Sequence, residues 1–173
     1  MVELLNIMDK REERILKTIK EFSKKLPRFS DGRIDYSNTD LAPSLTVFVK
    51  HEDNILLLKR SDKILAYKGK WSTVAGYLDE LKPIREKILE EAAEEIGLTK
   101  NDIMTIHIGR PFRFTDREIN KIWLCHPCLI ELKKKPNIKI DWEHTEYRWI
   151  KKEELKEFDI VPGLDKSLEE AFR

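Results

Sequence analysis

The 173-residue chain lacks the features that would place it in a membrane or on nucleic acid. No run of apolar residues approaches the roughly 20 needed to cross a bilayer, and the first residues do not form a basic start followed by an apolar stretch, so we expect no signal peptide. Lys+Arg 33 against Asp+Glu 32 leaves a net charge of +1, so no overall field attracts nucleic acid. We therefore expect a cytoplasmic protein that binds charged ligands through local groups.

Cysteine is also scarce. The only two are Cys125 and Cys128, within Cys-His-Pro-Cys. Such a pair can be half of a zinc site or a redox pair, but no other cysteine is present to complete a zinc site. Residues 122–130 are typical of a strand, on which residues three apart point to opposite faces. We therefore interpret both cysteines as packing residues.

The apolar content, 40% of the residues, is enough for one domain with a core. Residues 9–26 are predicted to form an amphipathic helix, and the turn-rich residues 27–41 a connector. We assign residues 1–41 to this N-terminal helix and connector. The segment could dock on the domain that follows, form a homodimer contact, or cover a substrate cleft.

From residue 42 onward the pattern changes to strands and further helices. The predicted strands cover residues 44–50, 54–59, 71–74, 104–114, 121–132 and 146–150, the first two forming a hairpin. Helices are predicted from Pro83 to Gly97 and near residues 152–158 and 164–172. Strands mixed with one central helix and several peripheral ones indicate an α/β sandwich over residues 42–173.

The central helix carries an acidic cluster. Glu91, Glu94 and Glu95 are spaced i, i+3, i+4, which makes them neighbours on one helix face, roughly 5–6 Å apart at Cβ. Carboxylates held together repel one another unless something positive lies between them. A hard divalent cation such as Mg²⁺ or Mn²⁺ is the simplest such partner. A solvated acidic helix face is the alternative.

The residues around this cluster resemble the box of the Nudix family, Gly-x5-Glu-x7-Arg-Glu-aliphatic-x-Glu-Glu-x-Gly-aliphatic. Gly76 takes the first position, Glu91 and the Glu94–Glu95 pair take the acidic ones, and Gly97-Leu98 closes the box. The resemblance extends over roughly residues 42–173 and implies a Nudix-type α/β/α sandwich with a mixed sheet. Residues 71–79, 141–149 and 158–164 are similar to Nudix domains that are sometimes fused to translation-initiation-factor-2B-like proteins.

Two charged positions depart from the box. Lys82 stands at the family's Glu, and Glu90 stands at its Arg. We hypothesise that Lys82 and Glu90 form a charge-reversed version of a structural ion pair. The alternative is two independent changes in a copy that has lost activity.

The resemblance implies hydrolysis of a diphosphate linkage in a nucleoside diphosphate derivative or a similar small molecule. It places the metal at Glu91, Glu94, Glu95 and Gly76. Catalytic roles fall to Glu94, Glu95 and Glu143, because one carboxylate must accept a proton from water. For substrate binding we select Arg60, Arg110 and Arg113, since arginine grips phosphate with two parallel hydrogen bonds. We add Glu146 to this set, an acid of the later segment that is also a candidate to accept the proton.

Two other functions stay open at this point. A nucleotide-binding regulatory module could use the same fold without turnover, and Lys82 and Glu90 motivate that reading. An isopentenyl-diphosphate isomerase-like enzyme would also handle a diphosphate. It would use a cysteine and an acid at the cleft, an arrangement that Cys125 and Cys128 fit poorly.

Overall fold

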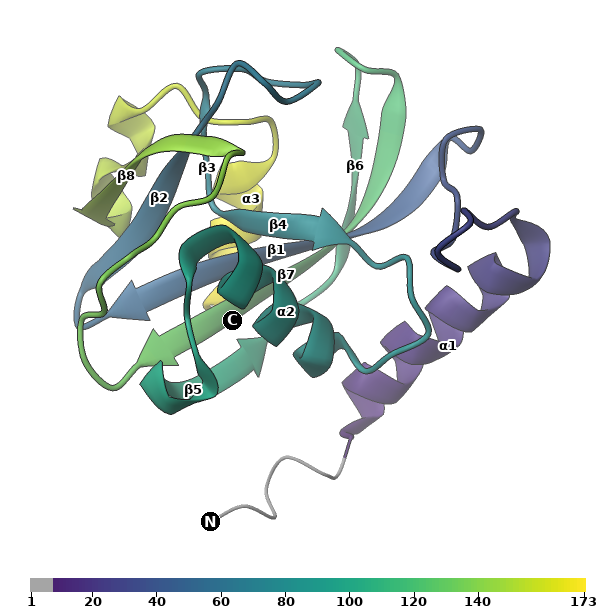
Figure 1. Cartoon of the computed structure of the whole chain (residues 1–173), viewed down its shortest axis with the longest axis horizontal. Helices are drawn as coiled ribbons and strands as arrows, with labels where there is room; N and C mark the ends of the chain where they lie inside the picture. The colour runs from purple at the N-terminus through teal and green to yellow at the C-terminus, as the bar shows by residue number, and fades with distance from the viewer. Residues whose placement is uncertain (1–7) are drawn as a thin grey trace.

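The computed structural model describes residues 8–173, so the first seven residues of the predicted N-terminal segment lie outside the described range. Figure 1 shows the arrangement of its elements. The strands are β1 (Leu41–His51), β2 (Asn54–Arg60), β3 (Trp71–Ser72), β4 (Val74–Tyr77), β5 (Ile103–Ile108), β6 (Phe112–Asp116), β7 (Lys121–Leu132) and β8 (His144–Lys151). The helices are α1 (Lys10–Lys25), α2 (Ile84–Ile96) and α3 (Leu164–Ala171), with short 3₁₀ helices η2 (Lys100–Asp102) and η3 (Lys152–Glu157).

The strands form one mixed sheet. Its order is β3-β2-β1-β7-β5, with β4 paired to β1, β6 to β7 and β8 to β2. Strands β1 and β7 run parallel over ten residue pairs, from Leu41–Ile122 to Lys50–Glu131, whereas the other pairs are antiparallel. The predicted hairpin of β1 and β2 is confirmed. Within residues 8–173, no helix combines the length and apolar character that crossing a bilayer requires.

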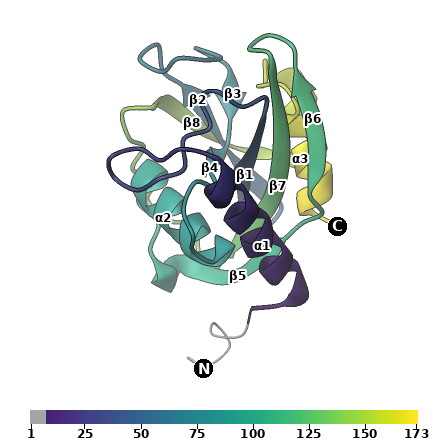
Figure 2. The ribbon, with the colours of Figure 1, turned by 90° about the vertical axis from the view of Figure 1, so that its right-hand side faces the viewer.

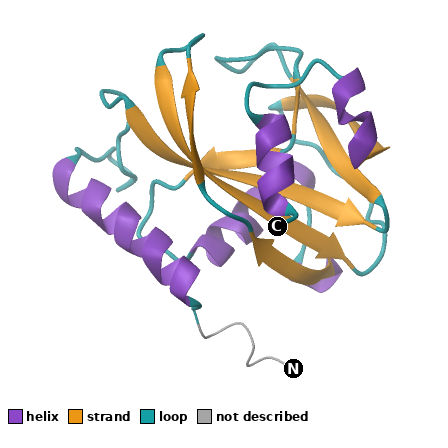
Figure 3. Cartoon of the chain, turned by 180° about the vertical axis from the view of Figure 1, so that it is seen from behind, coloured by secondary structure: helices purple, strands orange, loops and turns teal. Residues whose placement is uncertain are grey.

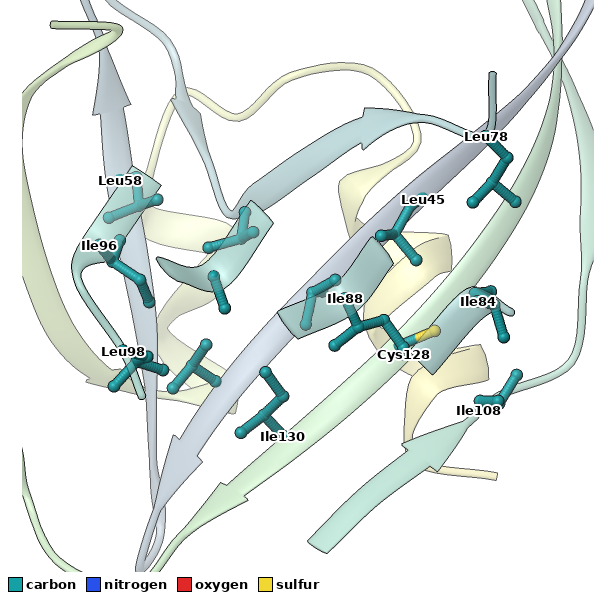
Figure 4. Packing of buried hydrophobic residues seen from close by; sticks show 14 of the residues in the cluster. Leu45, Leu58, Leu78, Ile84, Ile88, Ile96, Leu98, Ile108, Cys128 and Ile130 are labelled. Atoms are coloured by element: carbon teal, nitrogen blue, oxygen red, sulfur yellow. The ribbon is translucent and has the colours of Figure 1, made fainter. Parts of the chain in front are cut away.

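Helices cover both faces of the sheet, as Figures 1 and 3 show from opposite sides. Helix α2 packs on one face through its apolar stripe, and α3 packs on the other with η3 beside it. Figure 4 shows part of the core beneath α2. The stripe consists of Ile84, Ile88, Ala92 and Ile96, all of them buried. The predicted α/β/α sandwich is therefore confirmed, and the stripe fixes which face of α2 remains free for chemistry.

Helix α1 docks on the domain on the α2 side (Figure 2). Asp9 caps its N-terminus in a capping box with Glu12, a pairing that satisfies two otherwise free backbone N–H groups. Ile15 and Ile19 are buried in the same cluster as the α2 stripe. The buried Glu12 carboxylate forms an ion pair with Arg85 of α2, with 2.8 Å between Glu12 Oε1 and Arg85 Nε. The N-terminal helix is thus fixed to the helix that carries the acidic cluster.

The prediction of one strand over residues 104–114 was wrong. The structure has two strands, β5 and β6, separated by a break at Gly109. At Gly109 the backbone approaches α3 so closely that a Cβ would lie 2.2 Å from the carbonyl oxygen of Glu170. Pro111 follows, and it has no N–H to donate to a sheet. Similarly, residues 71–77 form two short strands, and Gly76 lies inside β4.

Candidate active site

A pocket of about 630 Å³ opens beside β4 and α2. It also reaches the loop after β2, the facing parts of β6 and β7, and the start of α3. The predicted site residues on its lining are Arg60, Gly76, Glu91, Glu94 and Glu143. A second pocket, of about 310 Å³, lies near Lys50 and contains none of them. The chemistry predicted from the sequence therefore converges on the larger pocket.

Glu95 joins α2 to β4 behind this lining. Its side chain is buried, and its Oε1 accepts a hydrogen bond of 3.1 Å from the backbone N–H of Ala75. Burial raises the pKa of Glu95 well above its usual range, and neighbouring carboxylates add to this effect, while the Ala75 N–H opposes it. A buried carboxyl next to other acids favours its neutral form unless a cation arrives.

His144 lies beside Glu95, although the sequence prediction did not include it among the site residues. Its Nε2 lies 3.6 Å from Glu95 Oε2, and its Nδ1 lies 2.9 Å from Asp141 Oδ1. Burial lowers the pKa of His144, so this ring and Glu95 both favour their neutral forms. The β2–β8 ladder positions the ring, because it pairs Arg60 with His144 across a bulge. Its place beside Glu143 in the sequence was the one signal available.

Glu91 lies against the backbone of Gly76. A Cβ added at Gly76 would lie 2.4 Å from Glu91 Oε1, so any side chain at this position would displace the Glu91 carboxylate. Burial raises the pKa of Glu91, and the Lys87 ammonium opposes the shift. The Gly76 and Glu91 positions of the predicted box are therefore in contact through space.

Lys87 is the second residue that the sequence prediction missed. Its Nζ lies 2.8 Å from Glu91 Oε1, 3.5 Å from Glu80 Oε2 and 3.8 Å from Asp79 Oδ1. The Lys87 side chain is largely buried, so its charge is balanced by these acids and not by water. Asp79 Oδ1 is buried and has no hydrogen-bond partner among residues 8–173. The i, i+4 spacing of Lys87 and Glu91 could have revealed this ion pair.

The charge-reversed pair exists in the structure. Lys82 Nζ lies 2.9 Å and 2.8 Å from the two carboxylate oxygens of Glu90, and 3.0 Å from Glu80 Oε2. The hydrogen bond to Glu90 raises the pKa of Lys82. The predicted ion pair between Lys82 and Glu90 is confirmed. The structure adds Glu80 as a third member.

Glu94 and Glu143 present less constrained side chains to the pocket. Glu94 is exposed, and in the described part of the chain its carboxylate makes no hydrogen bond or ion pair. Glu143 belongs to the loop before β8, where its carbonyl accepts a 2.7 Å hydrogen bond from the Ser61 N–H and its own N–H donates to Asp141 Oδ1 at 3.1 Å. The backbone of Glu143 is thus fixed while its side chain lines the pocket.

Of the residues predicted to bind substrate, Arg60 alone lines this pocket. Its Nε donates to the carbonyl of Ala66 at 3.0 Å, which leaves its terminal nitrogens for other partners. Burial lowers the pKa of Arg60, whereas the charges of Glu143 and Glu95 raise it. The side chain is therefore held among the acids of the site.

The structure does not bring the other three into the pocket. Arg110 is well exposed, with its Nε 4.0 Å from Glu170 Oε2. Arg113 is exposed on β6. Glu146 pairs with Arg148 at 2.7 Å on β8. Their predicted role in substrate binding has no geometric support in this pocket.

The residues of the pocket fit a divalent metal by donor type. Glu91, Glu94 and Glu143 offer carboxylate oxygens, the ligands that Mg²⁺ and Mn²⁺ prefer. The absence of a side chain at Gly76 leaves the space that Glu91 occupies. Within residues 8–173, however, no three His, Cys, Asp or Glu side chains already stand close enough together to hold an ion. The donors are present, and binding an ion requires their side chains to converge.

Comparison with known proteins identifies the class. The family model for the NUDIX domain matches residues 40–171, which include every predicted site residue and exclude α1. The chain therefore belongs to the Nudix family, as the box predicted. It is a Nudix-type pyrophosphohydrolase, an enzyme that acts on acid anhydrides.

Individual relatives are distant. The nucleoside triphosphatase NudI of Escherichia coli O139:H28 is 25% identical over 132 residues, which are 69% of this chain and 89% of that protein. A MutT protein from Methanosarcina mazei Go1 has a similar structure, with a TM-score of 0.63 and 22% identity over 79% of this chain and 96% of its own. A bifunctional NMN adenylyltransferase/ADP ribose pyrophosphatase from Francisella tularensis aligns with 91% of this chain and 45% of its own, at a TM-score of 0.63 and 20% identity.

Proposed function

We propose that this chain hydrolyses a diphosphate linkage in a nucleoside diphosphate derivative or a similar compound, with Mg²⁺ or Mn²⁺ as cofactor. The main support is the contact between Glu91 and Gly76 inside a pocket that Glu94 and Glu143 share. The name of the NudI relatives, nucleoside triphosphatase, supports a nucleotide as the substrate class. A cytoplasmic location and a homodimer stay predictions from the sequence.

Glu91, Glu94 and Glu95 would hold the ion. When bound, a divalent ion makes water a stronger acid and neutralises charge on phosphate oxygens. Glu95 must be ionised to act as a ligand, and its raised pKa opposes this in the metal-free protein. A nearby cation favours the charged form, so metal affinity should rise with pH.

The remaining residues divide between proton transfer and binding. Glu143 is suited to accept a proton from the attacking water, because its backbone is fixed and its side chain faces the pocket. Glu94 and Glu95 are the other candidates for this role. Arg60 is suited to bind a phosphate oxygen, since its Nε is already engaged and its terminal nitrogens remain.

A substrate screen tests the proposal. Nucleoside triphosphates, dinucleotides and nucleotide sugars are each incubated with the protein in Mg²⁺, Mn²⁺ or EDTA, and the products are analysed by mass. We expect cleavage of a diphosphate bond in metal and none in EDTA. Nucleotide binding without turnover in any metal would favour the regulatory module, and a product of unchanged mass would favour an isomerase.

A further inference from the structure

Three aromatic side chains form one wall of the active-site pocket: Tyr77 of β4, Trp123 of β7 and Phe114 of β6. The rings of Tyr77 and Trp123 lie 5.4 Å apart, centre to centre, at 50°. Trp123 and Phe114 are direct partners in the β6–β7 ladder, so they project from the same face of the sheet. This aromatic wall begins one residue after Gly76, where the Glu91 carboxylate lies.

Exposed apolar side chains gather at the same pocket. Leu65 is fully exposed, Trp142 is 60% exposed and Tyr77 is 42% exposed, and all three line it. Single exposed apolar residues are ordinary, but a group of them around one concave site marks a surface that a ligand covers. The pocket thus has a carboxylate side and an apolar, aromatic side.

The N-terminal segment supports this wall from behind. Tyr36 is buried, and its ring stacks on Tyr77 with centres 5.9 Å apart at 14°. Its hydroxyl donates to the carbonyl of Leu78 at 2.9 Å. On its other side, Phe22 of α1 meets Tyr36 edge to face at 5.6 Å. A continuous row of rings therefore connects α1 to the pocket.

The same segment contributes Arg33 to the pocket lining. Its Nη1 lies 3.6 Å from Asp79 Oδ2, and the neighbouring Ile34 N–H donates to the Asp79 carbonyl at 2.7 Å. Arg33 and Asp79 add a hydrogen-bonding donor and acceptor beside the aromatic wall. Both Arg33 and Tyr36 precede residue 40, where the match to the family model begins.

We infer that Tyr77 and Trp123, braced by Tyr36, form a stacking site for the planar nucleobase of the substrate. The inference rests on the proposed function for the position of the diphosphate, which would lie toward Glu91. An aromatic face attracts a planar base whatever its identity, and the polar groups of Arg33 and Asp79 suit the edge of a base better than an aliphatic chain. The N-terminal segment is then a part of the substrate site.

Binding measurements in EDTA test this without turnover. Calorimetry compares ADP with inorganic pyrophosphate, which lacks the base, on wild type and on the Tyr77→Leu variant. We expect wild type to bind ADP more tightly than pyrophosphate. Tyr77→Leu should lower the affinity for ADP at least about fivefold, which is the lower end for stacking one base on one ring. The same substitution should leave the affinity for pyrophosphate unchanged. Tyr147→Leu is the matched control, because Tyr147 is 40% exposed on β8, outside the pocket.

The brace is tested at Tyr36. Tyr36→Leu should also lower the affinity for ADP. Tyr36→Phe, which keeps the ring, should bind ADP nearly as tightly as wild type does. Because Tyr77 is partly exposed, its Leu variant decides the question even if Tyr36→Leu fails to fold. Equal wild-type affinity for ADP and pyrophosphate, or unchanged ADP affinity in Tyr77→Leu, would overturn the inference even if the enzyme is active. Loss of ADP affinity in that variant would support it even if the screen found no hydrolysis, an outcome that contradicts the proposed function alone.

Discussion

Four of the carboxylates of α2 fall into two groups with different electrostatic surroundings. Glu90 and Glu91 each have a lysine within 2.8 Å, Lys82 and Lys87 respectively. One turn further on, Glu94 is exposed to the pocket without an ion pair among residues 8–173, and Glu95 is buried beside a histidine that favours its neutral form. The first group is compensated by the fold itself, whereas the second lacks compensation.

The difference separates carboxylates that stabilise the helix through ion pairs, Glu90 and Glu91, from carboxylates without a lysine partner within the described residues, Glu94 and Glu95, which have more to gain from a divalent ion. A lysine balances part of the charge of Glu90 and of Glu91, so a divalent ion stabilises these two carboxylates less than it stabilises an acid without an ion pair. Ionising the buried Glu95 is unfavourable in the free protein, and a divalent ion relieves that cost. In the described part of the chain, Glu94 has no ion pair to break before it approaches an ion. Functional sites commonly retain such unfavourable arrangements. Four predictions test whether the two groups differ in this way.

The largest effect should come from the uncompensated group. Glu94→Gln keeps the shape of the side chain and removes its charge, so we expect turnover to fall at least about 100-fold, the lower range for a positioned acid–base group. The fold should persist because Glu94 is exposed. The measurement is kcat on the substrate that the screen identifies.

Glu86→Gln provides the matched control for that variant. Glu86 is an exposed acid on α2 that does not line the pocket, so its variant should retain wild-type turnover. An active Glu94→Gln enzyme would remove Glu94 from the proposed chemistry.

The next effect concerns the contact that links the box glycine to the helix. In Gly76→Ala the new methyl would lie 2.4 Å from Glu91 Oε1, so the carboxylate must rotate away. We expect Mn²⁺ affinity, measured by electron paramagnetic resonance, to fall about tenfold, which corresponds to about 1.4 kcal/mol. If the effect acts through Glu91, Gly76→Ala combined with Glu91→Gln should bind no more weakly than Glu91→Gln alone. Unchanged affinity in Gly76→Ala would place the ion elsewhere.

Much of this site could be predicted from local spacing. Helical periodicity alone identified the buried stripe of α2 and therefore the flanking positions of Glu91, Glu94 and Glu95, although burial of Glu95 itself was not predicted. The departures at Lys82 and Glu90 are opposite in sign, and this predicted their ion pair. These features involve only one helix and the residues just before it, so they can be predicted from residues that are close together in the sequence.

Features that depend on distant segments were not predictable in the same way. The stacking of Tyr36 on Tyr77 joins a connector to an edge strand, and no periodicity relates the two. Arg113 was selected as an arginine on a strand, but a strand has two faces, and the sequence did not indicate which one meets the pocket. The break at Gly109 arises from contact with α3, some sixty residues later in the chain.

A smaller effect is expected on stability. The folded-state pKa of Glu95 is raised above the ordinary value of 4.5, so the folded metal-free protein holds this proton more tightly than the unfolded chain does. Its contribution to stability is therefore fully present below the unfolded pKa and is lost as pH rises toward the folded pKa. Glu95→Gln removes this loss and can still accept the Ala75 hydrogen bond. In EDTA at pH 8 we expect the Tm of Glu95→Gln to exceed that of wild type by a few degrees. This corresponds to a difference in the free energy of unfolding on the order of 1 kcal/mol. The difference in Tm should be smaller at pH 5.

The matched control for this comparison is Glu94→Gln, whose exposed carboxylate should give no such pH-dependent gap. Saturating Mn²⁺ should reverse the order at pH 8, because the ion stabilises the protein that retains the carboxylate. A wild type that is more stable than Glu95→Gln in EDTA at pH 8 would show that Glu95 belongs with the compensated group.

The smallest effect should come from the compensated pair itself. Lys82 and Glu90 are partly exposed, so a double-mutant cycle of Lys82→Met and Glu90→Gln in urea should give a coupling of only about 0.5–1 kcal/mol. Turnover should change less than about twofold, the opposite of Glu94→Gln. The swap Lys82→Glu with Glu90→Arg restores the family's order of charges, yet we expect it to recover only part of the coupling. The reason is Glu80, whose carboxylate lies 3.0 Å from Lys82 and would then face a second acid. A coupling of zero would mean that the pair forms without stabilising the helix start, and that its charge reversal is incidental.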